Sequence, residues 1–294
     1  MADTTTWTIK ALLDWTKDYL ERNGSSSARL DAEILLAHVM GWQRIQLYTE
    51  FEHEPTDAQK ASYRGLIKER AQGRPVAYLI GRREFFSLDF AVSPDVLIPR
   101  PETEFLVVRA IDLLREENPQ GADKSVLDIG TGSGAIAIAL ATQLTELSVT
   151  AIDISSEALE IARSNAVQHD VADRITFLQG DTFSPLEASN QFDVIVSNPP
   201  YIGQSERETL PRDVVDFEPQ QALICGDEGL EMTSRIIAQG SQYLTENGWL
   251  LIESSPILMP RVQQRLAQED CFLPSTVIRD LAGLDRVVVA QKAA

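Results

Sequence analysis

The sequence has few of the residues that build metal sites and covalent cross-links. Its 294 residues include only 2 cysteines and 3 histidines. Cys225 and Cys271 are too few for a disulfide framework or a cysteine zinc cluster. The histidines His38, His53 and His169 are far apart and lack the spacing of metal ligands. We therefore expect no metal in the functional site.

Basic residues are also scarce relative to acidic ones. Lysine and arginine number 26 against 44 aspartates and glutamates, so the formal net charge is -18. This balance argues against a broad surface that grips phosphate backbones, and we expect no direct nucleic-acid partner. An acidic surface can attract a basic protein partner, but the simpler interpretation, which we adopt, is solubility.

Long apolar runs are missing as well. No run is long enough to span a bilayer, and residues 1–10 are too polar for a signal peptide. The hydrophobic fraction of 44% is ordinary for a globular protein. We therefore expect a cytoplasmic monomer with no membrane partner.

The first part of the chain is predicted to be helical. Apolar residues recur at helical spacing over residues 9–20, 28–40 and 56–71, and glycines follow each stretch. The pattern predicts a small helical domain over residues 1–75. By their burial habits, Trp7, Trp15 and Trp42 are expected in its core.

The pattern changes after Gly73. Residues 78–81 and 84–92 are rich in β-formers, and we interpret residues 76–96 as a β-hairpin linker. Residues 97–294 then alternate apolar strands with helices. The predicted strands are residues 125–129, 148–152, 175–178, 192–196, 249–252 and 286–290. The predicted helices begin near Pro101 and cover residues 135–144, 156–168, 230–244 and 260–268. This alternation predicts an α/β, Rossmann-like fold whose sheet is mostly parallel and covered on both faces.

Polar residues cluster where four of these strands end, the usual ligand edge of such a sheet. The first cluster is a glycine-rich turn, whose residues are Gly130, Thr131, Gly132, Ser133 and Gly134. Glycines there let the backbone approach a ligand in front of a helix N-terminus. The turn alone fits both NAD and S-adenosylmethionine.

Two further strand ends present carboxylates. Asp153 ends the second strand and can accept from both ribose hydroxyls, although it can also act as a helix cap. Asp181 and Thr182 follow the third strand. Asp181 can accept from an adenine amino group, or it can be an ordinary turn residue. Together with the glycine turn, these residues predict a site for an adenosyl-type cofactor.

The fourth cluster is Asn198-Pro199-Pro200-Tyr201, directly after a buried strand. Neither proline has an N–H, and each fixes its own φ and restricts the residue before it. The result is a stiff, extended corner that presents an amide, a free carbonyl and an aromatic ring. These groups suit a planar NH2-bearing acceptor, such as adenine, cytosine, glutamine or asparagine. NAD chemistry would need a hydride acceptor and usually a proton donor, and no histidine or lysine stands there.

At this point the sequence resembles a known family. Residues 128–137, Asp153 and Asn198–Tyr201 are similar to the S-adenosylmethionine-dependent methyltransferases that modify planar amino groups. Residues 97–104 (LIPRPETE), 81–86 and 217–230 (FEPQQALICGDEGL) resemble the HemK or PrmC family. Its members are N5-glutamine methyltransferases of peptide chain release factors. One departure is Glu253-Ser254-Ser255-Pro256, where the family usually has Glu-Ile-Gly.

The resemblance implies a class I methyltransferase sheet, S-adenosylmethionine as cofactor, and release factors as protein substrates. It also implies that the acceptor is the glutamine of a Gly-Gly-Gln motif, held by Asn198 and the Pro199 carbonyl beside Tyr201. Leu97, Arg100 and Pro200 are expected to line the substrate site. With no strong general base nearby, we expect the proton to leave after methyl transfer or to pass to water.

Three alternatives stay open on the sequence alone. They are a glutamine methyltransferase of a ribosomal protein, an adenine-N6 DNA methyltransferase, and a protein that binds the cofactor without catalysis. The second alternative lacks a visible basic target-recognition region. The helical domain is expected to dock the protein substrate, unless it serves stability only.

Overall fold

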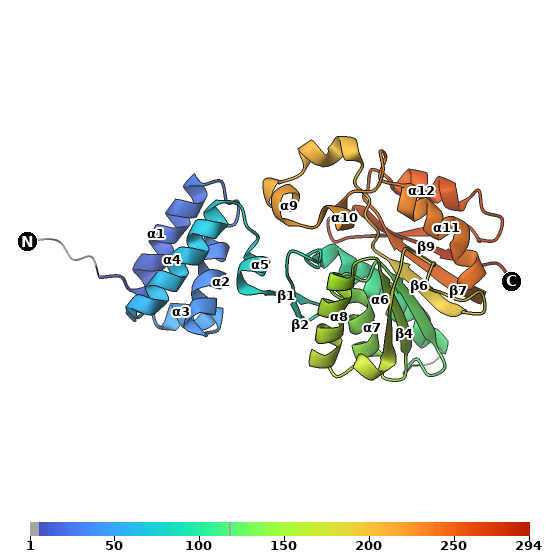
Figure 1. Ribbon diagram of the computed structural model, residues 1–294, viewed down its shortest axis with the longest axis horizontal. Helices are drawn as coiled ribbons and strands as arrows, with labels where there is room; N and C mark the ends of the chain where they lie inside the picture. Colours follow the sequence, from blue (N-terminus) through green and yellow to red (C-terminus); the bar gives the residue numbers. More distant parts are fainter. Residues whose placement is uncertain (1–5, 118) are drawn as a thin grey trace, which may run out of the picture. The chain divides into compact units, whose positions relative to one another are not determined.

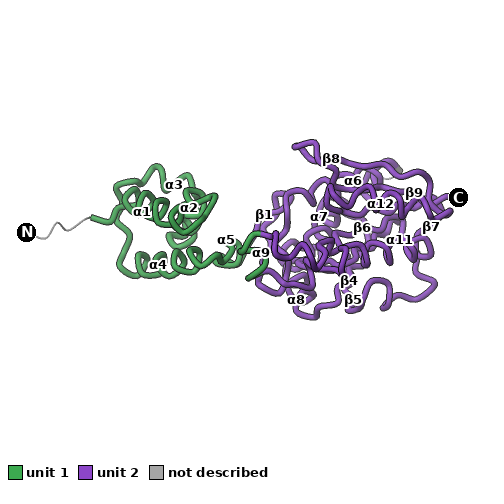
Figure 2. Tube along the Cα trace, turned by 90° about the horizontal axis from the view of Figure 1, so that it is seen from above, with its two compact units in different colours: residues 1–82, 211–217 green, residues 83–210, 218–294 purple. Residues whose placement is uncertain are grey.

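The structure is a computed structural model that describes residues 6–117 and 119–294. It divides into two compact units, which Figures 1 and 2 show along the chain. The first unit contains the described residues up to Arg82 together with Pro211–Phe217. The second contains Arg83–Leu210 and Glu218–Ala294. The division at Arg82 lies inside the expected linker, and the domain boundaries 1–75, 76–96 and 97–294 stay predictions.

The first unit is helical, as its apolar spacing predicts. Its helices are α1 (Ile9–Arg22), α2 (Ala28–Met40), α3 (Arg44–Thr49), α4 (Asp57–Ala71), α5 (Val76–Ile80) and α9 (Arg212–Phe217). Thr8 caps α1, because its hydroxyl accepts from the Ala11 N–H at 3.3 Å. Thr56 and Gln59 form a capping box at the start of α4. Gly41 ends α2 in the left-handed conformation, at φ 67°.

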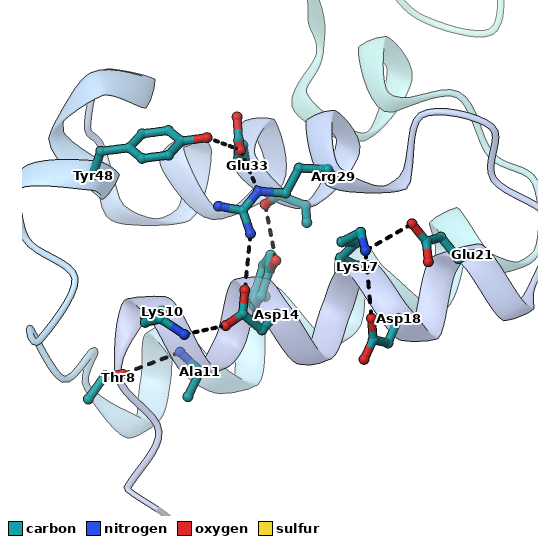
Figure 3. Close-up of polar contacts among 12 residues, drawn as sticks. Thr8, Lys10, Ala11, Asp14, Lys17, Asp18, Glu21, Arg29, Glu33 and Tyr48 are labelled. Atoms are coloured by element: carbon teal, nitrogen blue, oxygen red, sulfur yellow. Dashed lines mark hydrogen bonds and ion pairs between the residues drawn. The ribbon is translucent and has the colours of Figure 1, made fainter.

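Polar contacts tie α1 to α2 (Figure 3). The Arg29 guanidinium of α2 donates to Asp14 of α1 at 3.2 Å and to Glu33 at 2.7 Å. Tyr48 of α3 donates its hydroxyl to the same Glu33 carboxylate. Glu33 is buried, so these donors, together with Arg44, satisfy a charge that would otherwise be costly in the core.

Two expectations for this unit are wrong. Residues 78–81 are not a strand, because Val76–Ile80 forms the short helix α5 between Pro75 and a left-handed Gly81. Pro75 presets the first turn, and Val76, Leu79 and Ile80 pack on the helical core, so tertiary packing overrides their β-propensity.

The second wrong expectation is that all three tryptophans lie in the core of this unit. Trp7 and Trp15 are exposed, at 36% and 45%, and only Trp42 packs against the core. The exposed rings pack on each other instead. Trp7 meets Trp15 edge-on at 6.3 Å between centroids, and Trp15 stacks on Tyr19 at 5.1 Å. Positions 15 and 19 are one helical turn apart, which places both rings on the same face of α1.

The second unit begins with a hairpin of β1 (Arg82–Phe85) and β2 (Leu88–Ala91). Its helices are η1 (Pro101–Thr103), α6 (Glu104–Glu117), α7 (Ala135–Gln143), α8 (Ser156–Gln168), η2 (Ala172–Arg174), η3 (Gln204–Thr209), α10 (Gln220–Leu223), α11 (Glu231–Tyr243) and α12 (Met259–Leu266). Its remaining strands are β3 (Ser125–Ile129), β4 (Ser148–Asp153), β5 (Ile175–Gln179), β6 (Phe192–Ser197), β7 (Leu244–Glu253), β8 (Thr276–Arg279) and β9 (Asp285–Gln291).

In the described part of the chain these last strands form one seven-stranded sheet in the order β5-β4-β3-β6-β7-β9-β8. The strands from β5 to β7 pair in parallel, whereas β9 is antiparallel to both β7 and β8. The mostly parallel sheet is confirmed. The sequence pattern did not predict β8, a short strand at the sheet edge whose two outer residues are exposed and whose two inner residues are half-buried.

Alternate residues of each strand enter two separate cores, as the period of a strand requires. Val126, Val194 and Val196 face a core built with α6 and α7. Leu127 and Ile195 face a second core built with α11 and α12. The sheet is therefore covered on both faces, and its carboxyl edge is left for a site.

Among residues 6–117 and 119–294, no helix combines the length and the apolar composition needed to cross a membrane.

Candidate active site

The glycine-rich turn follows β3 at the carboxyl edge of the sheet. Gly130 and Gly132 have φ values of 74° and 55°, which side chains rarely adopt. A Cβ on Gly132 would meet nothing within 4 Å, so this backbone faces open space. Gly134 differs, because a Cβ there would lie 2.8 Å from Ile138 and 3.2 Å from Ala162. Gly134 therefore lets α7 and α8 pack closely.

A buried carboxyl lies beneath this turn. Asp128 is fully buried, and one of its oxygens accepts from the Thr131 hydroxyl at 2.7 Å. Its other oxygen has no hydrogen-bond partner. Burial raises the pKa of Asp128 to about 7. The fold therefore holds a carboxyl whose charge a nearby cation would stabilise.

Asp153 ends β4 and braces the turn. Its two oxygens accept from the Gly132 N–H at 2.8 Å and the Ser155 N–H at 3.0 Å. The side-chain cap of α8 is Ser155, whose hydroxyl accepts from the Ala158 N–H. Burial raises the pKa of Asp153. Each of its oxygens keeps a lone pair, so the carboxylate can still accept from ribose hydroxyls.

Asp181 follows β5 and is already paired. Arg235 of α11 donates to both of its oxygens, at 2.7 and 3.0 Å. This bidentate pair occupies the side chain that we expect to meet an adenine amino group. An adenine amino group would need a remaining lone pair of Asp181 or a movement of Arg235.

The Asn198 loop follows β6, next to β3. The Ser197 hydroxyl donates to the Ile129 carbonyl at 2.7 Å and joins the two strand ends. The Asn198 amide nitrogen donates to the Thr103 hydroxyl at 3.1 Å. Its carbonyl oxygen is left for an incoming donor. Tyr201 is mostly buried, and that burial raises the pKa of its hydroxyl to about 12, so the ring stays neutral.

The segment after the Asn198 loop is supported from behind by residues 223–229. Ile202 donates to the Leu223 carbonyl at 3.1 Å and accepts from the Cys225 N–H at 2.9 Å. A Cβ on Gly229 would lie 2.4 Å from the Tyr201 carbonyl oxygen, so only glycine allows this approach. The FEPQQALICGDEGL segment thus holds the Asn198 loop in place.

Arg100 is joined to the same segment. Its guanidinium donates to the buried carboxylate of Glu218, which also accepts from the Ile98 N–H. The contact links the LIPRPETE and FEPQQALICGDEGL segments, which are 118 positions apart at these residues. Arg100, expected to bind substrate, therefore has a structural partner in this structure.

A cavity of about 410 Å³ joins the two halves of the site, a usual size for a small-molecule pocket. The expected site residues that line it are Leu97, Gly130, Gly132, Asp153, Asp181, Thr182, Asn198 and Pro200. Those that do not line it are Arg100, Thr131, Ser133, Gly134, Pro199 and Tyr201. The cavity therefore touches both the glycine turn and the Asn198 amide.

Sequence reasoning missed four residues that shape this site: Thr103, Glu218, Arg235 and Glu253. Each acts across a long stretch of chain. The first two lie in the PRPETE and FEPQ segments that carry the resemblance, and Glu253 begins the segment that departs from the family pattern. Among the described residues, no group of three histidine, cysteine or carboxylate side chains is placed to hold a metal ion.

The site fits an adenosyl cofactor. The open space over Gly132 and the free lone pairs of Asp153 suit the ribose of such a cofactor, while the carboxyl of Asp128 lies beneath the turn, outside the cavity lining. Which atoms they contact stays a prediction.

Comparison with known proteins agrees with this geometry. Residues 11–81 match the model of the PrmC N-terminal domain, and residues 108–216 match that of the methyltransferase small domain. Two solved structures share the fold. The hMettl16 catalytic domain in complex with an RNA hairpin has a TM-score of 0.57 and 15% identity, covering 95% of this chain and 91% of that one. A methyltransferase from Pyrococcus furiosus has a TM-score of 0.53 and 18% identity, covering 80% and 100%.

The curated relatives extend over the whole chain. The release factor glutamine methyltransferase of Rhodopirellula baltica is 47% identical over 296 residues and covers 100% of both chains. The protein of that name from Koribacter versatilis is 40% identical over 285 residues, covering 97% of this chain and 99% of its own. The chain therefore belongs to the release factor glutamine methyltransferase family.

Proposed function

We propose that this enzyme transfers a methyl group from S-adenosylmethionine to the side-chain amide nitrogen of the glutamine in the Gly-Gly-Gln motif of peptide chain release factors. The observation that supports this most is the Asn198 amide, whose nitrogen is held by Thr103 while its oxygen is left for a donor in the cavity. Family membership favours this substrate over a ribosomal protein or DNA. A translation factor as substrate places the reaction in the cytoplasm.

The cofactor half of the site is the glycine turn with Asp153. The backbone of Gly130 and Gly132 lets the ligand lie close to the strand ends, and Asp153 accepts from its ribose. When bound, S-adenosylmethionine supplies an electrophilic methyl on a positively charged sulfur. The carboxyls of Asp128 and Asp153 favour that positive charge.

The acceptor half is the Asn198 corner. An amide nitrogen is a poor nucleophile because its lone pair is delocalised. Donating its two hydrogens to the Asn198 oxygen and the Pro199 carbonyl raises its electron density and aims the lone pair. With the cofactor bound, transfer would form the nitrogen–methyl bond and break the methyl–sulfur bond, and the acceptor nitrogen would then lose one proton, which we expect to pass to water. Orientation of this kind can lower the activation barrier by several kcal/mol, and the reduction reaches about 7–11 kcal/mol when the alignment is ideal.

The helical unit is expected to dock the release factor. Trp7 and Trp15 are exposed and, with the half-buried Tyr19, form an aromatic cluster on and beside α1. Aromatic side chains are enriched at protein interfaces because they bury a large area at little entropic cost. We expect this aromatic cluster to contact the folded body of the substrate rather than its acceptor loop.

The direct test is mass spectrometry of purified release factor after incubation with enzyme and cofactor. The expected result is one added methyl group on the glutamine of the Gly-Gly-Gln motif. A substrate with glutamate at that position should not react, since its oxygens would face the acceptors of the clamp. Methylation of duplex DNA, or of a ribosomal protein in preference to release factor, would contradict the proposal.

Asn198→Ala separates the two halves of the site. We expect single-turnover methyl transfer to fall about 100-fold or more, while S-adenosylmethionine affinity changes little. Asn190→Ala changes a half-buried asparagine outside the cavity, whose side-chain oxygen accepts from the Glu187 N–H at 2.8 Å; it is the control and should keep wild-type turnover. Wild-type turnover in Asn198→Ala would disprove the proposal that Asn198 holds the acceptor amide.

A further inference from the structure

A second buried carboxyl lies beside the acceptor corner. Ser197 pairs with Ile252 across β6 and β7, so the next residues, Asn198 and Glu253, are neighbours at the carboxyl edge of the sheet, where Glu253 still pairs with Val287 of β9. Glu253 is 1% exposed, and one of its oxygens has no hydrogen-bond partner. Glu253 does not line the cavity, so it has no evident contact with substrate or cofactor. Any effect of Glu253 on the reaction must therefore pass through a neighbouring side chain.

Thr103 is that neighbour. It ends η1 and is 4% exposed. Its hydroxyl accepts from the Asn198 amide nitrogen at 3.1 Å. Hydrogen bonding from Thr103 is also one of the effects that lower the pKa of Glu253, which makes Thr103 the natural donor to this carboxyl. A hydroxyl has one hydrogen to donate, and a carboxylate can only accept. When Glu253 is ionised, the Thr103 hydrogen points to it, and the lone pairs of Thr103 face Asn198.

This arrangement decides which way the Asn198 amide is turned. A lone pair of Thr103 accepts only from the NH2 end of the amide, so the oxygen end faces the cavity. If the amide flips, its NH2 group meets the NH2 group of the acceptor, and two donors cannot bond. We propose that Thr103 and Glu253 are positioning residues that hold the Asn198 oxygen toward the acceptor nitrogen. This inference rests on the proposed function of Asn198.

The protonation state of Glu253 should affect the hydrogen-bond chain that runs from Glu253 through Thr103 to Asn198. The groups that face it are Thr103 and Glu102 of η1, Arg100 before η1, Arg286 of β9 and Tyr201. Burial raises the pKa of Glu253 to about 7, against the opposing effects of Thr103 and Arg286. A protonated Glu253 can donate to Thr103, which frees the Thr103 hydrogen to bond the Asn198 oxygen and turn the amide round. Turnover at saturating cofactor should therefore fall as the pH drops below about 7.

The experiment compares Thr103→Val, Thr103→Ser and Glu253→Gln in the full-length enzyme with release factor as substrate. Thr103→Val keeps the shape but loses the acceptor, and we expect kcat to fall about tenfold or more with S-adenosylmethionine affinity unchanged. Thr103→Ser keeps the hydroxyl and should recover kcat to within about threefold of wild type. Glu253→Gln should lower kcat and remove the decline below about pH 7.

Two controls separate positioning from stability. Thr233→Val in α11 removes a hydroxyl that is as buried as that of Thr103 but has no hydrogen-bond partner, and it should leave kcat unchanged. In an Asn198→Ala background, Thr103→Val should cause no further loss, because no amide is left to orient.

The outcomes distinguish this inference from the proposed function. If Thr103→Val and Glu253→Gln both keep wild-type kcat and pH profile, or if Thr103→Val lowers turnover equally with and without Asn198, the positioning role is wrong. If Thr103→Val does not fold, the pH profile of Glu253→Gln decides alone. Failure of the proposed function would instead appear as wild-type turnover in Asn198→Ala.

Discussion

Two buried carboxyls, Asp128 and Glu253, and the half-buried Asp153 at the strand ends are expected to set how the enzyme responds to pH. Burial raises the pKa values of Asp128, Asp153 and Glu253, to about 7 for the first and last. A carboxyl whose native pKa is raised binds its proton more tightly in the folded state than in the unfolded state. Without ligand, stability therefore falls as pH rises from the unfolded pKa to the native one, and then levels off. If Glu253 positions Asn198 as proposed, the pH range of higher turnover is therefore also the range of lower stability of the free enzyme.

Glu253→Gln should therefore stabilise the free enzyme at high pH. The pKa of Glu253 rises from 4.5 to about 7 on folding. Removing the ionisable group should raise the free energy of unfolding by about 1–3 kcal/mol near pH 8.5, and by little near pH 5, where the native carboxyl is protonated. Denaturant unfolding at the two pH values measures this. A variant that is less stable than wild type at the higher pH would contradict the prediction.

Cofactor affinity should change with pH in the opposite direction. S-adenosylmethionine is cationic at its sulfur and amino group, so it binds better when Asp128 and Asp153 are ionised. We expect its affinity to weaken as the pH falls through about 7, the pKa of Asp128, and calorimetry should detect proton release on binding at that pH. Asp128→Asn should flatten this dependence, whereas Glu253→Gln should not. A pH-independent affinity in the wild-type enzyme would disprove the coupling.

At the scale of single residues, the sequence predicts those whose role depends on the local backbone conformation of their own motif. Gly130, Gly132 and Asn198 follow directly from the local motifs, and all three line the cavity. Thr103 and Glu253 could not be found in this way, because their meeting with Asn198 depends on the order of strands β6 and β7 and on where η1 lies. No local pattern encodes a contact between residues 95 positions apart.

At the scale of elements, the structure explains why a long segment follows the Asn198 loop. Residues 223–229 lie against Tyr201–Gly203 backbone to backbone, with Gly226 and Gly229 at positive φ. The strands and helices that surround the sheet could be predicted from their period. Residues 223–229 and the four-residue helix α10 before them could not be predicted in this way, since such short elements form only by packing on the loop they support.

Gly229→Ala tests that support. Gly229 has φ 75°, and a Cβ would lie 2.4 Å from the Tyr201 carbonyl oxygen, so the Asn198 loop must shift. We expect kcat to fall about tenfold or more, with a smaller change in cofactor affinity. Gly283→Ala is a matched control at φ 77° with nothing within 4 Å. It carries the same backbone cost, about 1–2 kcal/mol, without the clash. Equal effects of the two variants on kcat would contradict the supporting role.

At the scale of the whole molecule, the chain combines a catalytic unit with a helical unit of different surface character. The catalytic unit holds the cavity, and the helical unit exposes Trp7 and Trp15, which burial habits alone place in its core. Burial of tryptophan depends on how large the core is, and the helices of this unit fill their small core mainly with Leu, Ile, Ala and Tyr63 instead. Exposed aromatic rings that are held rigid by stacking are better suited to binding a partner than to stability.

Trp15→Ala should therefore affect a whole release factor and a short peptide differently. We expect KM for the intact protein to rise about 5- to 30-fold, which corresponds to about 1–2 kcal/mol for one contributing interface residue, and KM for a Gly-Gly-Gln peptide to stay unchanged. Ile45→Ala, which truncates a side chain of the same unit that is 64% exposed, is the control and should alter neither value. Steady-state kinetics with both substrates measures the split. An equal rise for protein and peptide would show that Trp15 acts on the catalytic unit or on stability, and docking through the aromatic cluster would then be wrong.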